Sequence, residues 1–296
     1  MKTFKSIYNQ DDRYYIDWDF DFKCNYKCIY CYQLEENILN TKILNHKSKI
    51  NIVLEWLSNL DKDFTLGLLG GEPTISNYYF DILNKLNSIF EYKKNSECYI
   101  STNFSQIETF YKNHPKIKNT HIWISIHPEY FKEESLNYIK YIRDFIDNDK
   151  DIILSPMLYY KNKNTLKLFD LILDFFNKNK NTLKLKYSAQ FIYKNQTKKL
   201  YFPELENYNF NSEKEFIFNN KKIEYNKLLK YPKFLNFKNW ECNANYFYIK
   251  ENVISNECLE FKSVINKNLK LPNTIVKCKY NQCIDYPMLL SKKVLT

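Results

Sequence analysis

The chain has 296 residues, of which 44% are hydrophobic, and it carries a formal net charge of +10. This length allows one large domain or two smaller ones, and the lack of any apolar run of about 18 residues predicts that no segment spans a membrane. The first residues, MKTFKSIYNQDDRYY, lack the apolar core of a signal peptide, so we expect a cytoplasmic protein.

The positive charge does not predict a nucleic-acid partner. Nearly all of it is lysine, because arginine occurs only as Arg13 and Arg143. The lysines alternate with Asn and Asp instead of forming one dense block, which is typical of a solvated surface. Readout of base edges usually relies on arginine. We therefore favour a solvated surface over a nucleic-acid interface.

Cysteine is plentiful and glycine is scarce. Eight cysteines in a chain expected in the cytoplasm favour metal ligation or catalysis over disulfides. The only three glycines are Gly67, Gly70 and Gly71. A chain so depleted of glycine should keep it where a positive φ or a close backbone approach requires it.

The first predicted strand, 14–22, leads directly into a cysteine motif. Apolar and polar residues alternate along this strand, and the segment CNYKCIYCY follows it with Cys24, Cys28 and Cys31. A structural zinc site needs four ligands, and no fourth Cys or His lies close by in the sequence. Three thiolates on a [4Fe–4S] cluster leave one iron open to a small molecule. A zinc knuckle remains the alternative.

The CxxxCxxC spacing, with an aromatic residue before the last cysteine, resembles the signature of radical S-adenosylmethionine (SAM) enzymes. The resemblance implies that Cys24, Cys28 and Cys31 hold a [4Fe–4S] cluster whose open iron chelates SAM. It also implies that an electron from the cluster cleaves SAM to a 5′-deoxyadenosyl radical, which takes a hydrogen atom from the substrate.

Residues 1–198 alternate between predicted strands and helices. Strands are predicted at 14–22, 64–69, 97–102, 121–126, 151–158 and 184–193. Helices are predicted at 50–60, 78–90, 136–146 and 166–176, with a weaker one at 104–116. Six strands separated by helices predict an α/β fold of parallel βαβ units. The resemblance implies a partial (β/α)6 barrel, in which sites gather at the carboxyl ends of the strands.

The glycines lie at the end of the second strand, in Leu66-GLLGGEPT74. Without a side chain, positions 70 and 71 would let the backbone approach a ligand, Glu72 can accept a hydrogen bond from an ammonium group, and Pro73 stiffens the exit. The alternative is an ordinary turn from strand to helix. The resemblance implies that Gly70, Gly71, Glu72 and Pro73 contact the amino group of SAM. Gly67 lies inside the strand and is expected to relieve crowding there.

Other strand ends provide weaker candidates. By resemblance, Asn103, Ser125, Met157 and Gln190 are expected to contact SAM. Many relatives have Asp where this chain has His127, so His127, Glu129 and Tyr130 are candidates for substrate contact or proton transfer; a structural histidine is the alternative. Cys98 is expected to be a core residue.

The last quarter of the chain contains a second cysteine group. Two short strands, 246–249 and 252–254, are predicted to form a hairpin with its turn near Glu251 and Asn252, and this hairpin would bring Cys242 and Cys258 together. Cys278 and Cys283 would complete a four-thiolate site. Zinc held by four cysteines is one interpretation. The pattern also resembles the start of SPASM or "twitch" domains, which implies one auxiliary [4Fe–4S] cluster.

We therefore expect a radical SAM barrel at 1–198, a connecting segment at 199–239 and a cysteine-rich α+β domain at 240–296. The connecting segment is expected to contain a helix near 213–230. The expected activity is hydrogen abstraction from a peptide or natural-product precursor, with an electron donor such as flavodoxin or ferredoxin. A dehydrogenase or epimerase acting on a sugar or aminocyclitol is an alternative. A zinc-stabilised binding protein without catalysis is an alternative of another class.

Overall fold

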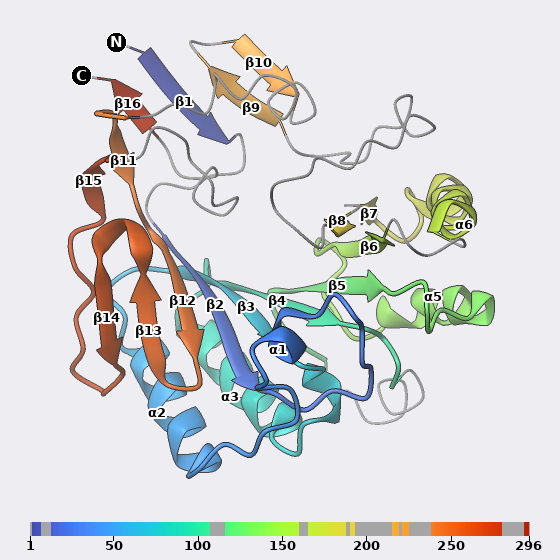
Figure 1. Ribbon diagram of the computed structural model, residues 1–296, viewed down its shortest axis with the longest axis horizontal. Coiled ribbons are helices and arrows are strands. Elements are labelled where there is room, and N and C mark those ends of the chain that lie inside the picture. Colours follow the sequence, from blue (N-terminus) through green and yellow to red (C-terminus); the bar gives the residue numbers. More distant parts are fainter. Residues whose placement is uncertain are drawn as a thin grey trace.

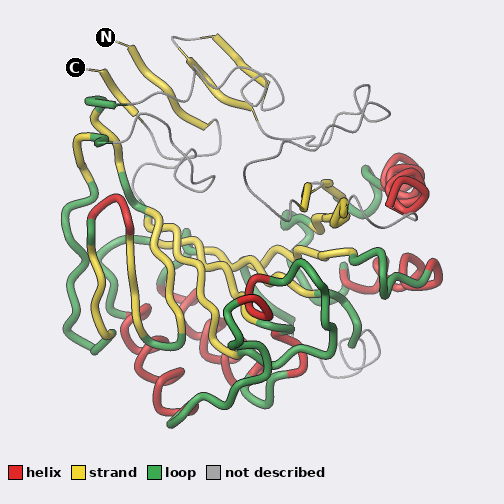
Figure 2. Tube along the Cα trace, viewed as in Figure 1, coloured by secondary structure: helices red, strands yellow, loops and turns green. Residues whose placement is uncertain are grey.

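The computed structural model describes residues 2–6, 13–106, 116–159, 165–187, 190–192, 215–218, 221–224, 238–279 and 293–295. Within these ranges, strands and helices alternate from residue 14 to 192, and further strands follow (Figure 1). Helices α2, His46–Ser58, and α3, Tyr79–Tyr92, lie along one face of a long sheet (Figure 1 and Figure 2). The predicted α/β class is confirmed.

The main sheet of the described residues has the order β14-β13-β12-β2-β3-β4-β5-β6-β7, and β8 pairs with β6. The neighbours from β2 to β7 are all parallel. Parallel order places their carboxyl ends at one edge, which we call the carboxyl edge. The strand bounds are β2 Tyr14–Asp21, β3 Phe64–Gly70, β4 Glu97–Thr102, β5 Thr120–Ile126, β6 Ile152–Tyr159, β7 Leu185–Tyr187 and β8 Gln190–Ile192.

Alternation along the strands separates two faces. In β2, the apolar residues Ile16 and Trp18 belong to the buried core, whereas Asp17 and Asp19 occupy the alternate positions. The core face is covered by helices with apolar stripes. These are α2 His46–Ser58, α3 Tyr79–Tyr92, α5 Ile139–Ile142 and α6 Thr165–Asn179. The other face, which we call the inner face, is therefore polar along β2.

The C-terminal strands extend this sheet. Strand β12, Tyr246–Lys250, pairs in parallel with β2, placing Tyr246 opposite Tyr15 and Lys250 opposite Asp19. Strands β13, Val253–Asn256, and β14, Phe261–Val264, continue it in antiparallel order. The sheet thus crosses the domain boundary expected at residue 240.

A second, antiparallel sheet has the order β10-β9-β1-β16-β11-β15. It brings the first and last described strands side by side (Figure 1). Its bounds are β1 Lys2–Ser6, β9 Glu215–Phe218, β10 Lys221–Glu224, β11 Glu241–Asn243, β15 Ile275–Lys277 and β16 Lys293–Leu295.

One predicted helix is only partly formed and another is wrong. The segment 136–146 contains the end of the 3₁₀ helix η2, Glu133–Tyr138, followed by the single α-helical turn α5. Its buried residues Leu136, Ile139, Ile142 and Ile146 are three, three and four residues apart, as the helix prediction assumed. The helix expected near 213–230 is the hairpin β9–β10, in which Phe218 pairs with Lys221.

Smaller differences concern turns and strand ends. The predicted strand 184–193 is divided into β7 and β8. In the β12–β13 hairpin, Glu251 and not Asn252 takes the left-handed conformation, with φ of 58°. Its N–H donates to Asp19 O and its C=O accepts from Trp18 Nε1. Most of the weaker helix predicted at 104–116 lies outside the described residues.

Within the described part of the chain, no helix is both long enough and apolar enough to cross a membrane.

Candidate active site

The first cysteine motif forms a loop at the carboxyl edge, directly after β2. Cys24 N–H donates to Asn40 Oδ1 at 2.9 Å, and Cys31 N–H donates to Cys28 O at 2.9 Å. Cys31 is the N-cap of the short helix α1, Tyr32–Glu35. Cys28 is buried, and Cys24 and Cys31 are half-buried. The loop thus gathers three thiols at the edge where a parallel sheet presents its sites.

The three thiols are candidate ligands for an iron–sulfur cluster. Burial is the main reason that the pKa of Cys24 is raised to about 11 and that of Cys28 to about 12, and the neighbouring thiols contribute to both shifts. The thiols therefore need a cationic partner to become thiolates at neutral pH. Three cysteines in one loop would leave one iron of a [4Fe–4S] cluster without a protein ligand.

Gly70 and Gly71 lie against the cysteine loop itself. Gly70 has φ of +139°, and a Cβ there would lie 2.2 Å from Asp21 O. A Cβ on Gly71 would lie 2.1 Å from Lys23 O and 3.0 Å from Cys24 Cβ. These glycines are therefore required by the approach of two chain segments, whereas the sequence interpretation attributed them to the approach of a ligand.

Glu72 is buried behind these glycines. Its Oε1 accepts from Thr74 Oγ1 and Thr102 Oγ1, both at 2.6 Å, and its Oε2 accepts from Asn103 N at 2.5 Å. Burial raises the pKa of Glu72, and these hydrogen bonds oppose that rise. The carboxyl group thus joins the ends of β3 and β4. The N–H groups of Gly71 and Glu72 are also bonded within the chain, to Asp21 O and Lys23 O.

The other candidate SAM contacts lie near the carboxyl edge. Asn103 Nδ2 donates to Asn25 Oδ1 at 3.1 Å and lies 3.9 Å from Cys24 Sγ. Ser125 lies opposite Ser155 on β5 and β6, and Met157 on β6 lies opposite Gln190 on β8. Pro73, which is buried, begins the 3₁₀ helix η1, Pro73–Ile75. Topology therefore brings these positions to one end of the sheet.

His127, Glu129 and Tyr130 contact the cysteine loop. The ring of Tyr130 stacks on that of Tyr26 with centroids 4.0 Å apart, and its hydroxyl accepts from Lys27 N at 3.0 Å. His127 Nδ1 lies 3.3 Å from Cys28 Sγ. Burial lowers the pKa of His127 to about 4. These residues hold the loop in place, which for His127 is the structural alternative that the sequence left open.

Sequence reasoning missed a group of carboxylates and phenols on the inner face. Tyr246 donates to Asp17, and both Tyr248 and Tyr32 donate to Asp19. Asp19 is fully buried, its pKa is raised by burial, and its Oδ1 has no hydrogen-bond partner. The alternation in YYIDWDFD pointed to these acids. The tyrosines were not predictable, because they come from another part of the chain.

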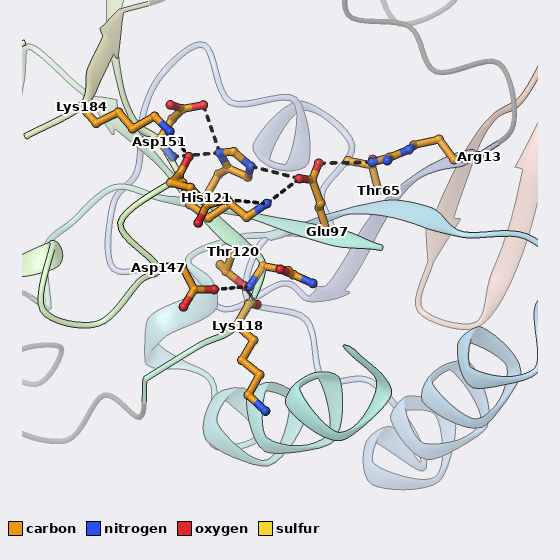
Figure 3. Close-up of polar contacts among 12 residues, drawn as sticks. Arg13, Thr65, Glu97, Lys118, Thr120, His121, Asp147, Asp151 and Lys184 are labelled. Carbon is orange, nitrogen blue, oxygen red and sulfur yellow. Dashed lines mark hydrogen bonds and ion pairs between the residues drawn. The ribbon is translucent and has the colours of Figure 1, made fainter. Parts of the chain in front are cut away.

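It also missed a network of charged side chains near the amino-terminal ends of the strands (Figure 3). His121 lies 3.3 Å from Asp151 Oδ2 and 3.8 Å from Glu97 Oε1. Glu97 also pairs with Arg13 at 3.2 Å and with Lys150 at 2.7 Å. Although burial opposes the change, hydrogen bonds from His121 and Lys150 lower the pKa of Glu97 to about 2. The network ties β2, β4, β5 and β6 together.

The second cysteine group lies at the opposite end of the β2–β12 pair. Cys242 in β11 is buried and lies opposite Val276, whereas Cys278 N–H donates to Trp240 O at 2.8 Å. Cys242 and Cys278 are therefore diagonal neighbours on adjacent strands, a spacing of about 7–8 Å between Cα atoms. Cys258 lies in the 3₁₀ helix η5, Glu257–Leu259. Cys283 lies outside the described residues.

Asn256 connects Cys258 to the chain that follows Cys242. Its Nδ2 donates to Ala244 O at 2.7 Å and to Tyr246 O at 2.8 Å, and its Oδ1 accepts from Leu259 N at 3.0 Å. These contacts bring together the segments that carry Cys242 and Cys258. Ligation of a metal by these cysteines stays a prediction.

No family model matches the sequence, and no curated protein matches it. Among solved structures, the chain is similar to anSMEcpe with bound AdoMet, at 14% identity and a TM-score of 0.43, over 67% of this chain and 55% of that one. It is similar to anSMEcpe with bound AdoMet and Kp18Cys peptide at 11% identity and a TM-score of 0.46, over 93% of this chain and 79% of that one. It is similar to BtrN in complex with AdoMet and 2-DOIA at 14% identity and a TM-score of 0.36, over 82% of this chain and 72% of that one. The chain thus spans little more than half of the first of these proteins.

Proposed function

We propose that this chain is a radical SAM enzyme with one auxiliary cluster. Cys24, Cys28 and Cys31 would hold a [4Fe–4S] cluster with an open iron, and Cys242, Cys258, Cys278 and Cys283 would hold the second. One observation carries the proposal. Three thiols occupy one loop at the carboxyl edge of a parallel α/β sheet, packed against the backbone of Gly70 and Gly71.

When bound, the first cluster and SAM supply a 5′-deoxyadenosyl radical that takes hydrogen from the substrate. The chain's own part is to bind and orient. Backbone groups of 70–73 would face the SAM amino group, with Asn103 and Ser125 beside them. Met157 and Gln190, paired across β6 and β8, would line the far side of the SAM site.

We propose that the substrate lies on the inner face, between the two cysteine groups. From Tyr15 to Asp21 the strand β2 rises about 20 Å, at about 3.3 Å per residue. Along it, Asp17 and Asp19 are joined to tyrosines from β12 and α1. Carboxylates and phenols suit a substrate that carries amine or hydroxyl groups.

A peptide or natural-product precursor meets that requirement, and so does a sugar or aminocyclitol. The inner-face carboxylates favour neither of these over the other. An electron donor such as flavodoxin or ferredoxin would supply the electron for the first cluster.

The test is metal analysis joined to SAM cleavage. The protein is reconstituted anaerobically with iron and sulfide, and dithionite is added with SAM. We expect about eight irons per chain for two four-iron clusters, with formation of 5′-deoxyadenosine and methionine. A protein that holds only zinc and leaves SAM intact would be the zinc-stabilised binding protein instead.

A further inference from the structure

Cys28 has a side-chain neighbour that the proposed chemistry leaves unused. His127 Nδ1 lies 3.3 Å from Cys28 Sγ and 3.0 Å from Tyr30 Oη, and Tyr30 in turn donates to Glu129 Oε2 at 3.1 Å. The rings of His127 and Tyr30 are parallel within 5°, with centroids 6.0 Å apart. Four groups from two loops, 97 to 99 residues apart in sequence, thus form one chain of contacts.

The position of His127 is fixed by its surroundings. The N–H groups of Tyr130 and Phe131 donate to His127 O at 3.1 and 3.0 Å, which closes a turn directly after β5. The ring of Tyr26 packs edge-on against the imidazole at 5.7 Å. The imidazole therefore has little freedom to turn away from Cys28.

The contacts also assign the proton on His127. A thiolate only accepts hydrogen bonds, so when Cys28 is a thiolate its contact with Nδ1 at 3.3 Å requires a proton on Nδ1. Tyr30 has one hydroxyl proton and neighbours both Glu129 and Cys28, so it is a second donor beside His127.

We propose that His127 donates its Nδ1–H to the Cys28 thiolate and thereby raises the reduction potential of the cluster that this thiolate holds. The inference rests on the proposed function, because it requires the cluster. Hydrogen bonds to the sulfurs are one of the factors that set the potential of iron–sulfur clusters. A donor stabilises the reduced state more, since reduction adds negative charge to the sulfurs. His127 is thus a positioning residue that acts through Cys28.

The test compares reduction potentials in the iron-loaded full chain, measured by an EPR-monitored titration without substrate. His127→Leu removes the donor, whereas His127→Asn keeps an N–H donor at the δ position. We expect His127→Leu to make reduction about tenfold less favourable, which corresponds to about 59 mV for one electron. His127→Asn should stay near the wild-type potential, which a purely structural role does not predict.

If His127→Leu takes up no iron, His127→Gln tests the inference in its place, because it carries its N–H donor at the ε position and not at the δ position. Its potential should lie below that of His127→Asn. Iron-loaded His127 variants whose potentials all equal the wild-type value would overturn the inference alone. A wild-type protein without iron would overturn the proposed function, and this inference with it.

Discussion

The two cysteine groups lie at opposite ends of the same pair of strands and are built in different ways. Cys24, Cys28 and Cys31 lie in a loop at the carboxyl edge, and residues from two other segments, 70–71 and 127–130, hold that loop. Cys242 and Cys278 lie within or next to paired strands, and Asn256 joins Cys258 to them. One group depends on contacts between loops, and the other on a sheet and a hairpin.

This difference suits two different tasks. A loop with three thiols at the edge of the sheet leaves one side open, as a cluster that binds SAM requires. Under the proposed function, the second group would supply four thiols and enclose a metal centre, as a site without an exchangeable ligand requires. The inner face, with its carboxylates and phenols, lies between the two.

The largest effect should come from Gly71→Ala, which should disrupt the first cysteine group and leave the second intact. The new Cβ would lie 2.1 Å from the backbone atom Lys23 O and 3.0 Å from Cys24 Cβ, so the cysteine loop has to move. We expect about four of about eight irons to be lost, with SAM cleavage abolished. Iron and 5′-deoxyadenosine are measured together.

Gly67→Ala is the matched control, because its Cβ would lie 2.1 Å from Asp17 Oδ1, the end of a side chain that can turn. Iron should stay near the wild-type value, at a cost in stability of about 1 kcal/mol. Equal iron loss in both variants would mean that the glycines only serve the turn.

Asn256→Ala should weaken the second group and spare the first. It removes three hydrogen bonds from a side chain that is only 4% exposed. We expect a loss of about 1–3 kcal/mol in the free energy of unfolding, together with loss of the auxiliary iron. Ser255→Ala, which removes one long hydrogen bond of 3.4 Å, is the control. If SAM cleavage fell with Asn256→Ala as far as with Gly71→Ala, the two groups would not be separate.

The smallest effect should appear as a pH dependence of stability that leaves both iron sites intact. Burial lowers the pKa of His121, but hydrogen bonds and charge from Asp151 and Glu97 outweigh it and raise the pKa above its ordinary value. The folded chain then keeps a proton that the unfolded chain releases above about pH 6.5. Stability is therefore full below that pH and falls as the pH rises.

Because one group titrates, the slope is at most about 1.4 kcal/mol per pH unit. Urea unfolding of wild type and His121→Asn between pH 6 and 9 measures it. A variant with an undiminished slope would show that His121 is not its source.

Local pattern predicted most of the barrel. The strands at 64–69 and 97–102 appear within one residue, because apolar and polar residues alternate and each strand packs one face on helices. The helix predicted at 136–146 is divided into η2 and the single turn α5, although its buried residues keep the spacing of three and four. The hairpin of β9 and β10 was missed although Asn219-Asn220 stands between its strands.

The candidate cysteine ligands can be predicted from their spacing in the sequence, but the residues that surround them in the fold cannot. Asp21 and Lys23 reach Gly70 and Gly71, and His127 reaches Cys28, only through pairing of distant segments. No local pattern encodes such contacts. For the same reason, the sequence did not predict that the tyrosines of β12 donate hydrogen bonds to Asp17 and Asp19 on the inner face.

The most direct test of the central claim is the iron content of two matched triple variants after anaerobic reconstitution. Cys24, Cys28 and Cys31 are changed to Ala in one, and Cys242, Cys258 and Cys278 in the other. Each should hold about four irons against about eight in the wild type, and only the first should lose binding of SAM. If either variant loses all its iron, or if the first still cleaves SAM, the account of two separate clusters is contradicted.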